Sequence, residues 1–378
     1  MGTDADAELS SRSRRVRPMT LEDLPDVAAL FERVARSGSG QASPGLAPYL
    51  ARTLFDCPWS DPEIPPLVYE SASGSITGFL GAHARRFRFA GRPIRLACAG
   101  PLVTEPDGSK RLAGALLVLR MIRSGPQDMT ITDGANAASR RLTETAGGES
   151  TYLGALGWIR LLRPASFANN HLFGRRRSRR PARIDALLRP LAASADALIG
   201  AKQGLRQLPP DTAAEELTPG TLLDNLEAVT HSLQLYPDYD EAYLCWAFTE
   251  MERVTSRGRL VTSLVRDGRG RFLGWYVYYL QPGGECWVIQ IAAVRRKVGL
   301  VIDHLFHDAY VGGGTAVRGR LEPRLLEPVS ERGGIFRYAG TSILHSRDPA
   351  LLATAVSADS LLTYLDGEWW MGPHLPLA

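Results

Sequence analysis

The sequence predicts a mixed α/β (α+β) chain with two tandem domains, each a mixed, mostly antiparallel sheet flanked by helices. Its 378 residues, of which 44% are hydrophobic and 22% charged, are enough to form two hydrophobic cores. A meander of three strands occurs twice along the chain. Two short sequence features also recur at matching places in the two halves. These observations favour two copies of one domain over a single large domain.

In the first half, a strand and a helix precede the meander. Thr20 followed by Glu22 and Asp23 is a typical helix start, and apolar residues then recur at helical spacing. Short glycine turns separate the strands of the meander, and Gly147-Gly148 ends the last helix. The expected elements are strands at 16–18, 65–71, 76–84, 94–99 and 129–133, helices that begin near 20, 111 and 135, and a closing strand region at 151–162.

Between the two halves, residues 164–219 become Arg-rich and then Pro- and Ala-rich. A helical stretch near 187–205 is the regular element expected there, and no strand pattern is present. The expected domains are therefore 1–165 and 219–378, joined by a linker at 166–218. In the second domain the sequence predicts helices at 221–233 and 240–251 and strands at 260–266, 272–280 and 286–292.

Two anchors support the internal repeat. Gly78 in Ile-Thr-Gly-Phe-Leu matches Gly274 in Phe-Leu-Gly-Trp-Tyr, and a strand glycine permits close approach of a backbone or ligand. Asn136 stands eleven residues before Gly147-Gly148, and Glu322 stands eleven residues before the second Gly-Gly pair. The anchors are 58 residues apart in the first half and 48 in the second, so the second copy lacks ten residues. We expect the missing residues in the span that carries the chemistry.

A loop with a Pro-acid turn follows the first meander. Residues 102–117 read LVTEPDGSKRLAGALL, in which small residues open an apolar helix. The backbone N–H groups and the positive end of such a helix suit a pyrophosphate. The stretch resembles the acyl-CoA signature of the GNAT superfamily, a hydrophobic-x-x-Pro-acid turn followed by Gln/Arg-x-x-Gly-x-Gly. Pro106, Asp107 and Gly114 match it, whereas Ser109 replaces the Gln/Arg and Leu112 replaces the first Gly.

The resemblance implies that acetyl-CoA or another acyl-CoA binds the first domain as co-substrate. The expected binding residues lie at the end of the meander, in the loop and at the starts of the two following helices. They are Leu102, Val103, Ser109, Lys110, Arg111, Leu112, Ala113, Gly114, Ala115 and Asn136. The second copy has neither the Pro-acid turn nor the Gly-x-Gly loop, so it is not expected to bind CoA. The alternative is that the first domain has also lost the cofactor while keeping the fold.

A second stretch resembles the family at the right distance. Residues 133–138 read DGANAA and open a helix, with Asn136 at the asparagine of the pattern Asn-x-x-Ala-x-x-x-Tyr-x-x-x-Gly-Phe. The resemblance implies that the tyrosine gives a proton to the leaving thiolate. Thr143 occupies that position here and Val329 in the second copy, and threonine is a poor general acid. The resemblance covers residues 16–158 and does not name a substrate.

Transfer of an acyl group from a thioester to an amine needs a base and a hydrogen-bond donor for the oxyanion. By resemblance, the donor is the backbone of Leu102 and Val103. Residues 94–103 contain no Asp or Glu, so the base must come from elsewhere or be absent. His83 and Asp133 are the candidates from nearby strands, together with Thr143 as a catalytic position. A structural His83 and an Asp133 that caps the next helix are the alternatives, and no metal is expected.

These patterns predict an acyl-CoA-dependent N-acyltransferase of the EC 2.3.1 class, most simply an N-acetyltransferase, that modifies the amine of a small molecule or peptide. Fem-type aminoacyl-tRNA transferases are similar tandem folds, and the basic cluster Arg175–Arg183 would contact tRNA phosphates. A solvated linker is the other interpretation of this cluster. A non-catalytic GNAT-fold binding protein is the third hypothesis. The sequence does not define the acyl group, the acceptor or the oligomeric state.

Composition indicates the expected compartment. The four cysteines, Cys57, Cys98, Cys245 and Cys286, form no CxxC pair, which argues against a disulfide framework or a zinc site. No apolar run is long enough for a membrane span, and the first residues lack an apolar signal segment. We expect a cytoplasmic protein. Only three of the 44 basic residues are lysine, a bias typical of a GC-rich bacterial genome.

Two aromatic and acidic stretches have competing interpretations. Residues 236–243 read YPDYDEAY and could recognise an acceptor, but Asp240 as a helix N-cap is the preferred reading. Residues 365–370 read LDGEWW, in which the two tryptophans could line a pocket or close the last core. A core role is preferred for Trp369 and Trp370.

Overall fold

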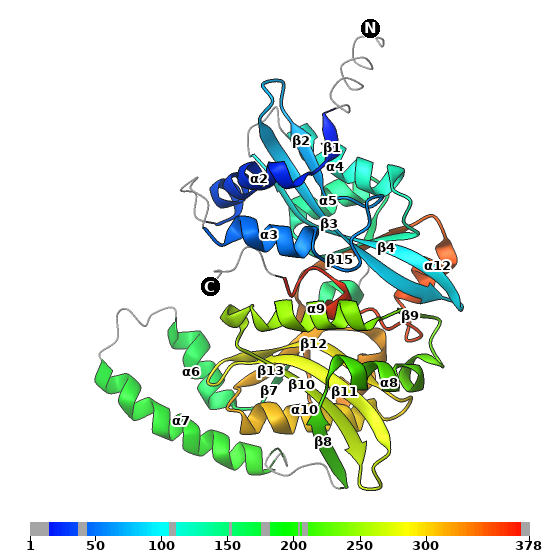
Figure 1. Cartoon of the computed structure of the whole chain (residues 1–378). Helices are drawn as coiled ribbons and strands as arrows, with labels where there is room; N and C mark the ends of the chain where they lie inside the picture. Colours follow the sequence, from blue (N-terminus) through cyan, green and yellow to red (C-terminus); the bar gives the residue numbers. More distant parts are fainter. Residues whose placement is uncertain are drawn as a thin grey trace. The chain divides into compact units, whose positions relative to one another are not determined.

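The computed structural model describes residues 15–36, 44–105, 111–150, 153–174, 182–202, 205 and 211–371. These residues form two compact units, each with a mixed sheet (Figure 1). Unit 1 takes the described residues within Met1–Ala155, Gln234–Ser256 and Gly340–Ala378, and unit 2 those within Leu156–Leu233 and Arg257–Ala339. The expected boundaries at residues 165 and 218 follow chain order and do not coincide with these limits.

Unit 1 is built on an eight-stranded sheet in which β3 and β4 form a long hairpin. A short strand, β9 (Leu235–Pro237), pairs with the turn end of β3. The other strands are paired in the order β1 (Val16–Pro18), β2 (Leu67–Glu70), β3 (Ile76–Phe89), β4 (Arg92–Thr104), β5 (Met129–Ala135), β15 (Thr341–Ser346) and β6 (Glu149–Ser150).

The helix α4 (Arg111–Ser124) anchors the core of unit 1. Its residues Ala113, Leu116, Leu117 and Met121 pack with apolar side chains of β2, β3 and β4. Other helices of unit 1 are α2 (Leu24–Phe31), α3 (Leu46–Leu54), α5 (Ala137–Thr145), α9 (Glu241–Glu252) and α12 (Pro349–Ala355), with short turns η1 (Leu21–Asp23), η2 (Glu32–Arg36), η4 (Leu153–Ala155), η6 (Thr255–Arg257, which ends at the unit boundary) and η8 (Tyr364–Asp366).

Unit 2 repeats this plan on a seven-stranded sheet. Its strands are paired in the order β14 (Ile335–Tyr338), β7 (Leu156–Leu161), β13 (Ala316–Arg320), β12 (Glu285–Ala293), β11 (Phe272–Leu280), β10 (Arg259–Asp267) and β8 (Thr212–Glu216). Its helices are α6 (Pro164–Gly174), α7 (Ala182–Lys202), α8 (Pro219–Thr230), α10 (Val298–Val311), η7 (Pro323–Leu325) and α11 (Leu326–Glu331). The apolar face of α10, including Val301, Leu305 and Ala309, is buried.

The internal repeat is visible in the backbone as well as in the sequence. Each meander is followed by a 14-residue helix, α4 or α10, and by a strand parallel to the last strand of the meander. Gly148 N donates to Thr143 O at 2.8 Å, and Gly334 N donates to Val329 O at 2.9 Å. A Cβ on either glycine would lie against the Thr143 or Val329 side chain. Thr143 and Val329 are therefore structurally equivalent.

The ten residues missing from the second copy lie mainly in the hairpin rather than in the loop. Gly78 lies 26 residues before the end of β4, whereas Gly274 lies 19 before the end of β12. The connection from that strand to the following helix differs by two residues. It takes seven residues from Thr104 to Arg111 in the first copy and five from Ala293 to Val298 in the second. The expectation that the loop span holds most of the difference is wrong, since long β3 and β4 account for it.

Two expectations for the connecting segments are also wrong. The closing strand expected at 151–162 for the first domain is β7, which pairs with β13 and β14 of unit 2, while β15 pairs with β5 in unit 1. The region expected to lack strands contains β8, an edge strand on β10. Strand pairing rather than local pattern decides both, because β8 is exposed and has no apolar alternation.

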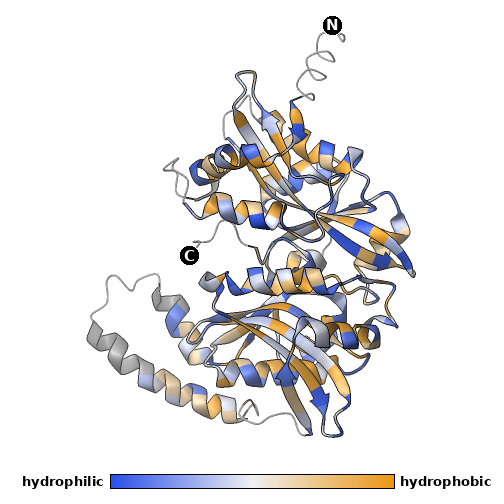
Figure 2. Ribbon diagram, viewed as in Figure 1, coloured by the Kyte–Doolittle hydropathy of each residue, from blue (hydrophilic) through white to orange (hydrophobic). Residues whose placement is uncertain are grey.

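Hydropathy follows these elements (Figure 2). Several strands carry hydrophobic runs, whereas the turn end of the β3–β4 hairpin is partly hydrophilic, and α3 and α9 alternate between hydrophobic and hydrophilic residues. Within the described part of the chain, no helix is both long and apolar enough to cross a membrane. The four cysteines are free thiols, and Cys57, Cys98 and Cys286 are buried.

Candidate active site

The two central strands of unit 1 part at a defined residue. β4 and β5 pair in parallel only where Leu96–Cys98 lies beside Met129–Ile131. β4 then continues to Thr104, paired with β3 alone, and β5 continues to Ala135. A one-residue bulge in β4 between Ala99 and Leu102 marks the divergence. We call this opening between β4 and β5 the fork.

The carboxyl group of Glu368 lies in the fork and joins its two strands. Its Oε2 accepts a hydrogen bond from Cys98 Sγ on β4 at 2.8 Å, and its Oε1 accepts one from Asp133 N on β5 at 2.9 Å. A Cβ on Gly100 would lie 2.7 Å from Oε1, so β4 needs glycine here for the carboxyl to fit. Glu368 therefore occupies the point where the strands separate.

The C-terminal segment that carries Glu368 is held by several buried contacts. Thr363 and Asp366 form a capping box, and Asp366 Oδ1 accepts a hydrogen bond from Tyr239 OH at 2.6 Å. Arg85, which is 1% exposed, donates from Nε to the Asp366 carbonyl at 3.0 Å. Tyr49 OH donates to the Met371 carbonyl at 2.6 Å. These bonds fix the backbone on both sides of Glu368.

Glu368 and Cys98 in the fork both bind their protons more tightly than exposed side chains of the same type. Burial, reinforced by the nearby Asp133 carboxylate, raises the pKa of Glu368 to about 8. Burial also raises the pKa of the Cys98 thiol well above its usual value, with the neighbouring carboxylates acting in the same direction. Side-chain atoms of Cys98, Asp133 and Glu368 lie within 4.8 Å of one another. Zinc accepts such donors, but both Glu368 oxygens already accept hydrogen bonds.

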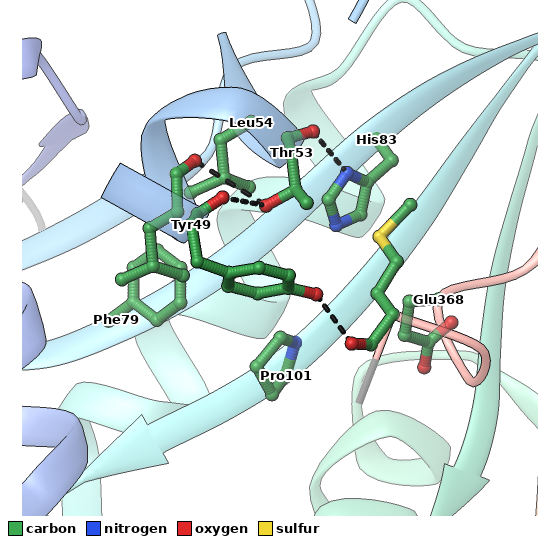
Figure 3. Close-up of a pocket in the computed structure, with 9 residues that line it drawn as sticks. Tyr49, Thr53, Leu54, Phe79, His83, Pro101 and Glu368 are labelled. Carbon is green, nitrogen blue, oxygen red and sulfur yellow. Dashed lines mark hydrogen bonds between the residues drawn. The ribbon is translucent and has the colours of Figure 1, made fainter. Parts of the chain in front are cut away.

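A small cavity lies on the α3 side of Glu368 (Figure 3). Its volume of about 10 Å³ is close to the space that one water molecule needs. It is mostly apolar, and the polar groups on its wall come from Tyr49, Thr53, His83 and Glu368. Leu50, Leu54, Phe79, Pro101 and Met371 complete the lining.

His83 is neutral in this cavity. Burial and the adjacent positive charge of Arg85 lower its pKa to about 3. Its Nδ1 lies 3.2 Å from the Thr53 carbonyl, which can only accept a hydrogen bond, so the proton of the neutral ring is on Nδ1. Nε2 is then the ring nitrogen with a lone pair.

The structure brings two of the three predicted catalytic residues near Glu368. His83 shares the cavity wall with it, and Asp133 donates its backbone N–H to it. The alternative that Asp133 caps the next helix is wrong, because Asn136 caps α5 by accepting from Ala138 N and Ser139 N. Thr143 lies in α5, where its hydroxyl donates to Ser139 O at 2.9 Å.

The expected acyl-CoA residues are arranged along β4 and α4. Leu102 and Val103 lie on β4 beyond the fork, opposite Leu80 and Phe79 of β3. Leu112, Ala113, Gly114 and Ala115 form the first turns of α4 with Arg111, while Ser109 and Lys110 lie outside the described residues. The edge of β4 from Ala99 to Thr104 that faces away from β3 has no described strand partner. An unpaired strand edge is the kind of surface to which an extended ligand can add backbone hydrogen bonds.

Sequence reasoning missed Glu368 and Cys98. The pattern of residues 365–370 predicts a core role only for the two tryptophans, and Trp370 is fully buried. A glutamate beside two tryptophans in a segment expected to be buried needs hydrogen-bond partners, and this was the sequence signal that could have pointed to Glu368. Asp240 is the N-cap of α9, as preferred, with Oδ1 accepting from Tyr243 N at 2.8 Å. Residues 175–181 of the basic cluster lie outside the described residues.

Comparison with solved structures supports the fold described above. A GCN5-related N-acetyltransferase from Kribbella flavida matches with a TM-score of 0.56 and 16% identity, over 91% of this chain and 74% of that one. The fold is that of the GNAT superfamily. A GCN5-related N-acetyltransferase from Anabaena variabilis matches this GNAT fold with a TM-score of 0.54 and 11% identity, over 88% of this chain and 72% of that one.

A third structure, a probable N-acyltransferase from Enterococcus faecalis V583, has a TM-score of 0.55 and 7% identity, over 88% of this chain and 72% of that one. No protein-family model and no curated protein sequence matches the chain. At these identities the GNAT likeness concerns the fold alone, so the chemistry must be argued from the residues of the fork.

Proposed function

We propose that this GNAT-fold chain is an acyl-CoA-dependent N-acyltransferase whose active site is the fork of unit 1. The position of the Glu368 carboxyl between β4 and β5 carries this proposal. The solved structures with this fold include proteins described as N-acetyltransferases and as a probable N-acyltransferase. The acceptor is an amine of a small molecule or peptide.

In this proposal acyl-CoA is a co-substrate that lies along the unpaired edge of β4. The backbone N–H groups of Leu102 and Val103 are the candidates to donate to the carbonyl oxygen of the thioester, where negative charge develops during attack. The start of α4, at Arg111 and Gly114, would face the pyrophosphate with its positive end. CoA supplies the activated acyl group and a thiolate leaving group.

Glu368 would take the proton that the amine loses. A protonated alkylamine has a pKa near 10, so a carboxylate with an ordinary pKa would be a weak acceptor. The buried Glu368, with a pKa of about 8, is much closer to the amine and to neutral pH. His83 is a weaker candidate because its pKa is about 3. It contributes a neutral, fixed wall instead.

Binding of acyl-CoA tests the proposal, and Gly114→Ala separates binding from folding. A Cβ at Gly114 would meet only side-chain atoms of Leu142, Thr104 and Leu102, at ordinary distances of 3.4–3.8 Å. Alanine should therefore leave the free energy of unfolding unchanged or raise it by up to about 1 kcal/mol. Loss of close approach to the pyrophosphate should weaken acetyl-CoA binding about tenfold or more, measured by calorimetry.

Calorimetry on the full chain should include acetyl-CoA and longer acyl-CoAs, with free adenosine as a control for nonspecific binding. Acyl transfer to a panel of amines would follow in the same buffer. Absence of heat with every acyl-CoA, in a chain that unfolds cooperatively, would refute the proposal. Equal binding by wild type and Gly114→Ala would place the pyrophosphate elsewhere.

A further inference from the structure

One side chain of the fork has no part in the chemistry described so far. Cys98 is the last residue of β4 that pairs with β5, and its side chain is fully buried. Its thiol donates to Glu368 Oε2. Because the thiol is buried, solvent does not compete for this hydrogen bond. On β3 the residue directly opposite Cys98 is His83, which places the thiol beside the cavity wall.

The two bonds to Glu368 come from different strands and together define its orientation. Oε1 is fixed by the Asp133 backbone on β5 and Oε2 by the Cys98 thiol on β4. Close packing of Gly100 against Oε1 excludes a shift toward that strand. Without the thiol, the carboxyl keeps only backbone donors, from Asp133 and from Glu368 itself, loses its one side-chain donor on β4 and gains rotational freedom about its terminal torsion.

We propose that Cys98 is a positioning residue, whose hydrogen bond holds the Glu368 carboxyl at the fork in the orientation that accepts the proton of the acceptor amine. This inference rests on the proposed function. The thiol stays protonated throughout, and the acyl group passes directly from CoA to the amine.

The charged and titratable groups around Glu368 define what the test should show. Asp133 on β5 disfavours ionisation of Glu368, whereas the Cys98 thiol favours it by donating a hydrogen bond. His83 on β3 is neutral, and Arg85 on β3 donates to the Asp366 carbonyl rather than to Glu368. On α3, the polar residues on the cavity wall are Tyr49 and Thr53. Loss of the thiol therefore removes the one side chain that donates to the carboxylate among these neighbours.

The experiment compares the pH dependence of acyl transfer in full-length wild type, Cys98→Ala, Cys98→Val and Cys98→Ser. Alanine and valine lack the donor, and valine also fills the space. We expect kcat to fall about 10- to 100-fold in both, the range for a lost hydrogen bond to a charged group. The acid limb of the profile should move to higher pH by about one unit. Serine still donates a hydrogen bond, so Cys98→Ser should keep most of the wild-type kcat and an acid limb close to that of wild type. KM for acyl-CoA should change little.

Cys286→Ala is the matched control, since Cys286 is a buried cysteine of unit 2. It should lower stability without moving the pH profile. Unchanged profiles in Cys98→Ala and Cys98→Val, with wild-type transfer intact, would overturn the positioning role alone. An acyl adduct on Cys98 that forms and decays at the turnover rate, seen by intact mass spectrometry, would also overturn it. No transfer by wild type to any amine would count against the proposed function itself.

Discussion

The two sheets part at equivalent places, but different groups close them. In unit 1 the last parallel pair is Cys98 with Ile131, and in unit 2 it is Trp287 with Arg318. β4 and β12 each run six residues further, to Thr104 and Ala293, and each has a one-residue bulge just beyond the parting. The backbone plan is therefore the same in both copies.

In unit 2 the opening is closed by an ion pair. Arg324, from η7 immediately after β13, donates to the Ile291 carbonyl of β12 and to Glu322. Ile291 lies four residues beyond the last pair, the position that Leu102 has in unit 1. The side chains of Arg324 and Glu322 are each 10% exposed. This closure pairs a guanidinium with a carboxylate and occupies the Ile291 carbonyl of β12.

In unit 1 the opening is closed instead by the Glu368 carboxyl, which accepts a hydrogen bond from a protonated thiol. Glu368 comes from a distant segment of the chain and leaves the outer edge of β4 without a strand partner in the described structure. Under the proposed function, the opening of unit 1 is the reactive one, whereas that of unit 2 is closed by a structural contact. The following predictions test that difference, beginning with the largest expected effect.

Glu368→Gln should reduce kcat for acyl transfer about 10²- to 10⁴-fold, the usual contribution of a general base. Glutamine keeps the size and can still accept from Asp133 N, so acyl-CoA binding should change little. Glu322→Gln, the matched change in unit 2, should leave kcat within about twofold in the folded protein. Comparable losses of kcat in both variants would remove the distinction between the two openings.

Arg324→Met should destabilise the protein by about 3 kcal/mol, because it leaves the Glu322 carboxylate buried without its cation. Urea unfolding followed by tryptophan fluorescence measures this loss. The affinity for acetyl-CoA under folding conditions should be unchanged, since the change lies in unit 2. A gain in acyl-CoA binding by the variant would instead show that Arg324 had been blocking a second functional opening.

The pH dependence of stability gives a smaller test. Glu368 has a pKa of about 8 in the folded protein and an ordinary value of 4.5. Between these values the folded state holds a proton that the unfolded chain has released, so this group makes stability fall as pH rises. Glu368→Gln lacks the effect. Its Tm relative to wild type should therefore increase from pH 5 to pH 8 in a thermal scan, and a constant difference would mean that Glu368 ionises normally.

Much of the fold could be predicted from local pattern, because strands and helices with strong apolar periodicity appear where expected. Apolar stretches bounded by turn residues located α4, β11 and β12 within a few residues. The exchange of β7 and β15 could not be predicted, since hydrogen-bond partners of strands far apart in sequence leave no local signal. β8 could not be predicted either, because this exposed edge strand has no local apolar pattern.

The candidate site shows the same division. His83 and Asp133 were accessible to sequence reasoning because they lie on strands of the resembling domain. Glu368 lies 235 residues after Asp133, and only the fold brings the two together. Residues 94–103 contain no acid. That the base comes from elsewhere or is absent stays a prediction, for which Glu368 is the proposed candidate. The chemistry of the fork depends on which side chain from another segment lies in it, and the sequence patterns of β4 and β5 do not specify that side chain.

A crystal structure of the full-length protein with acetyl-CoA tests the central claim most directly. We expect density for the co-substrate along β4 beyond Cys98, with the thioester beside the Glu368 carboxyl and the pyrophosphate at the start of α4. Density along β12 beyond Trp287, or none at saturating acetyl-CoA, would contradict it.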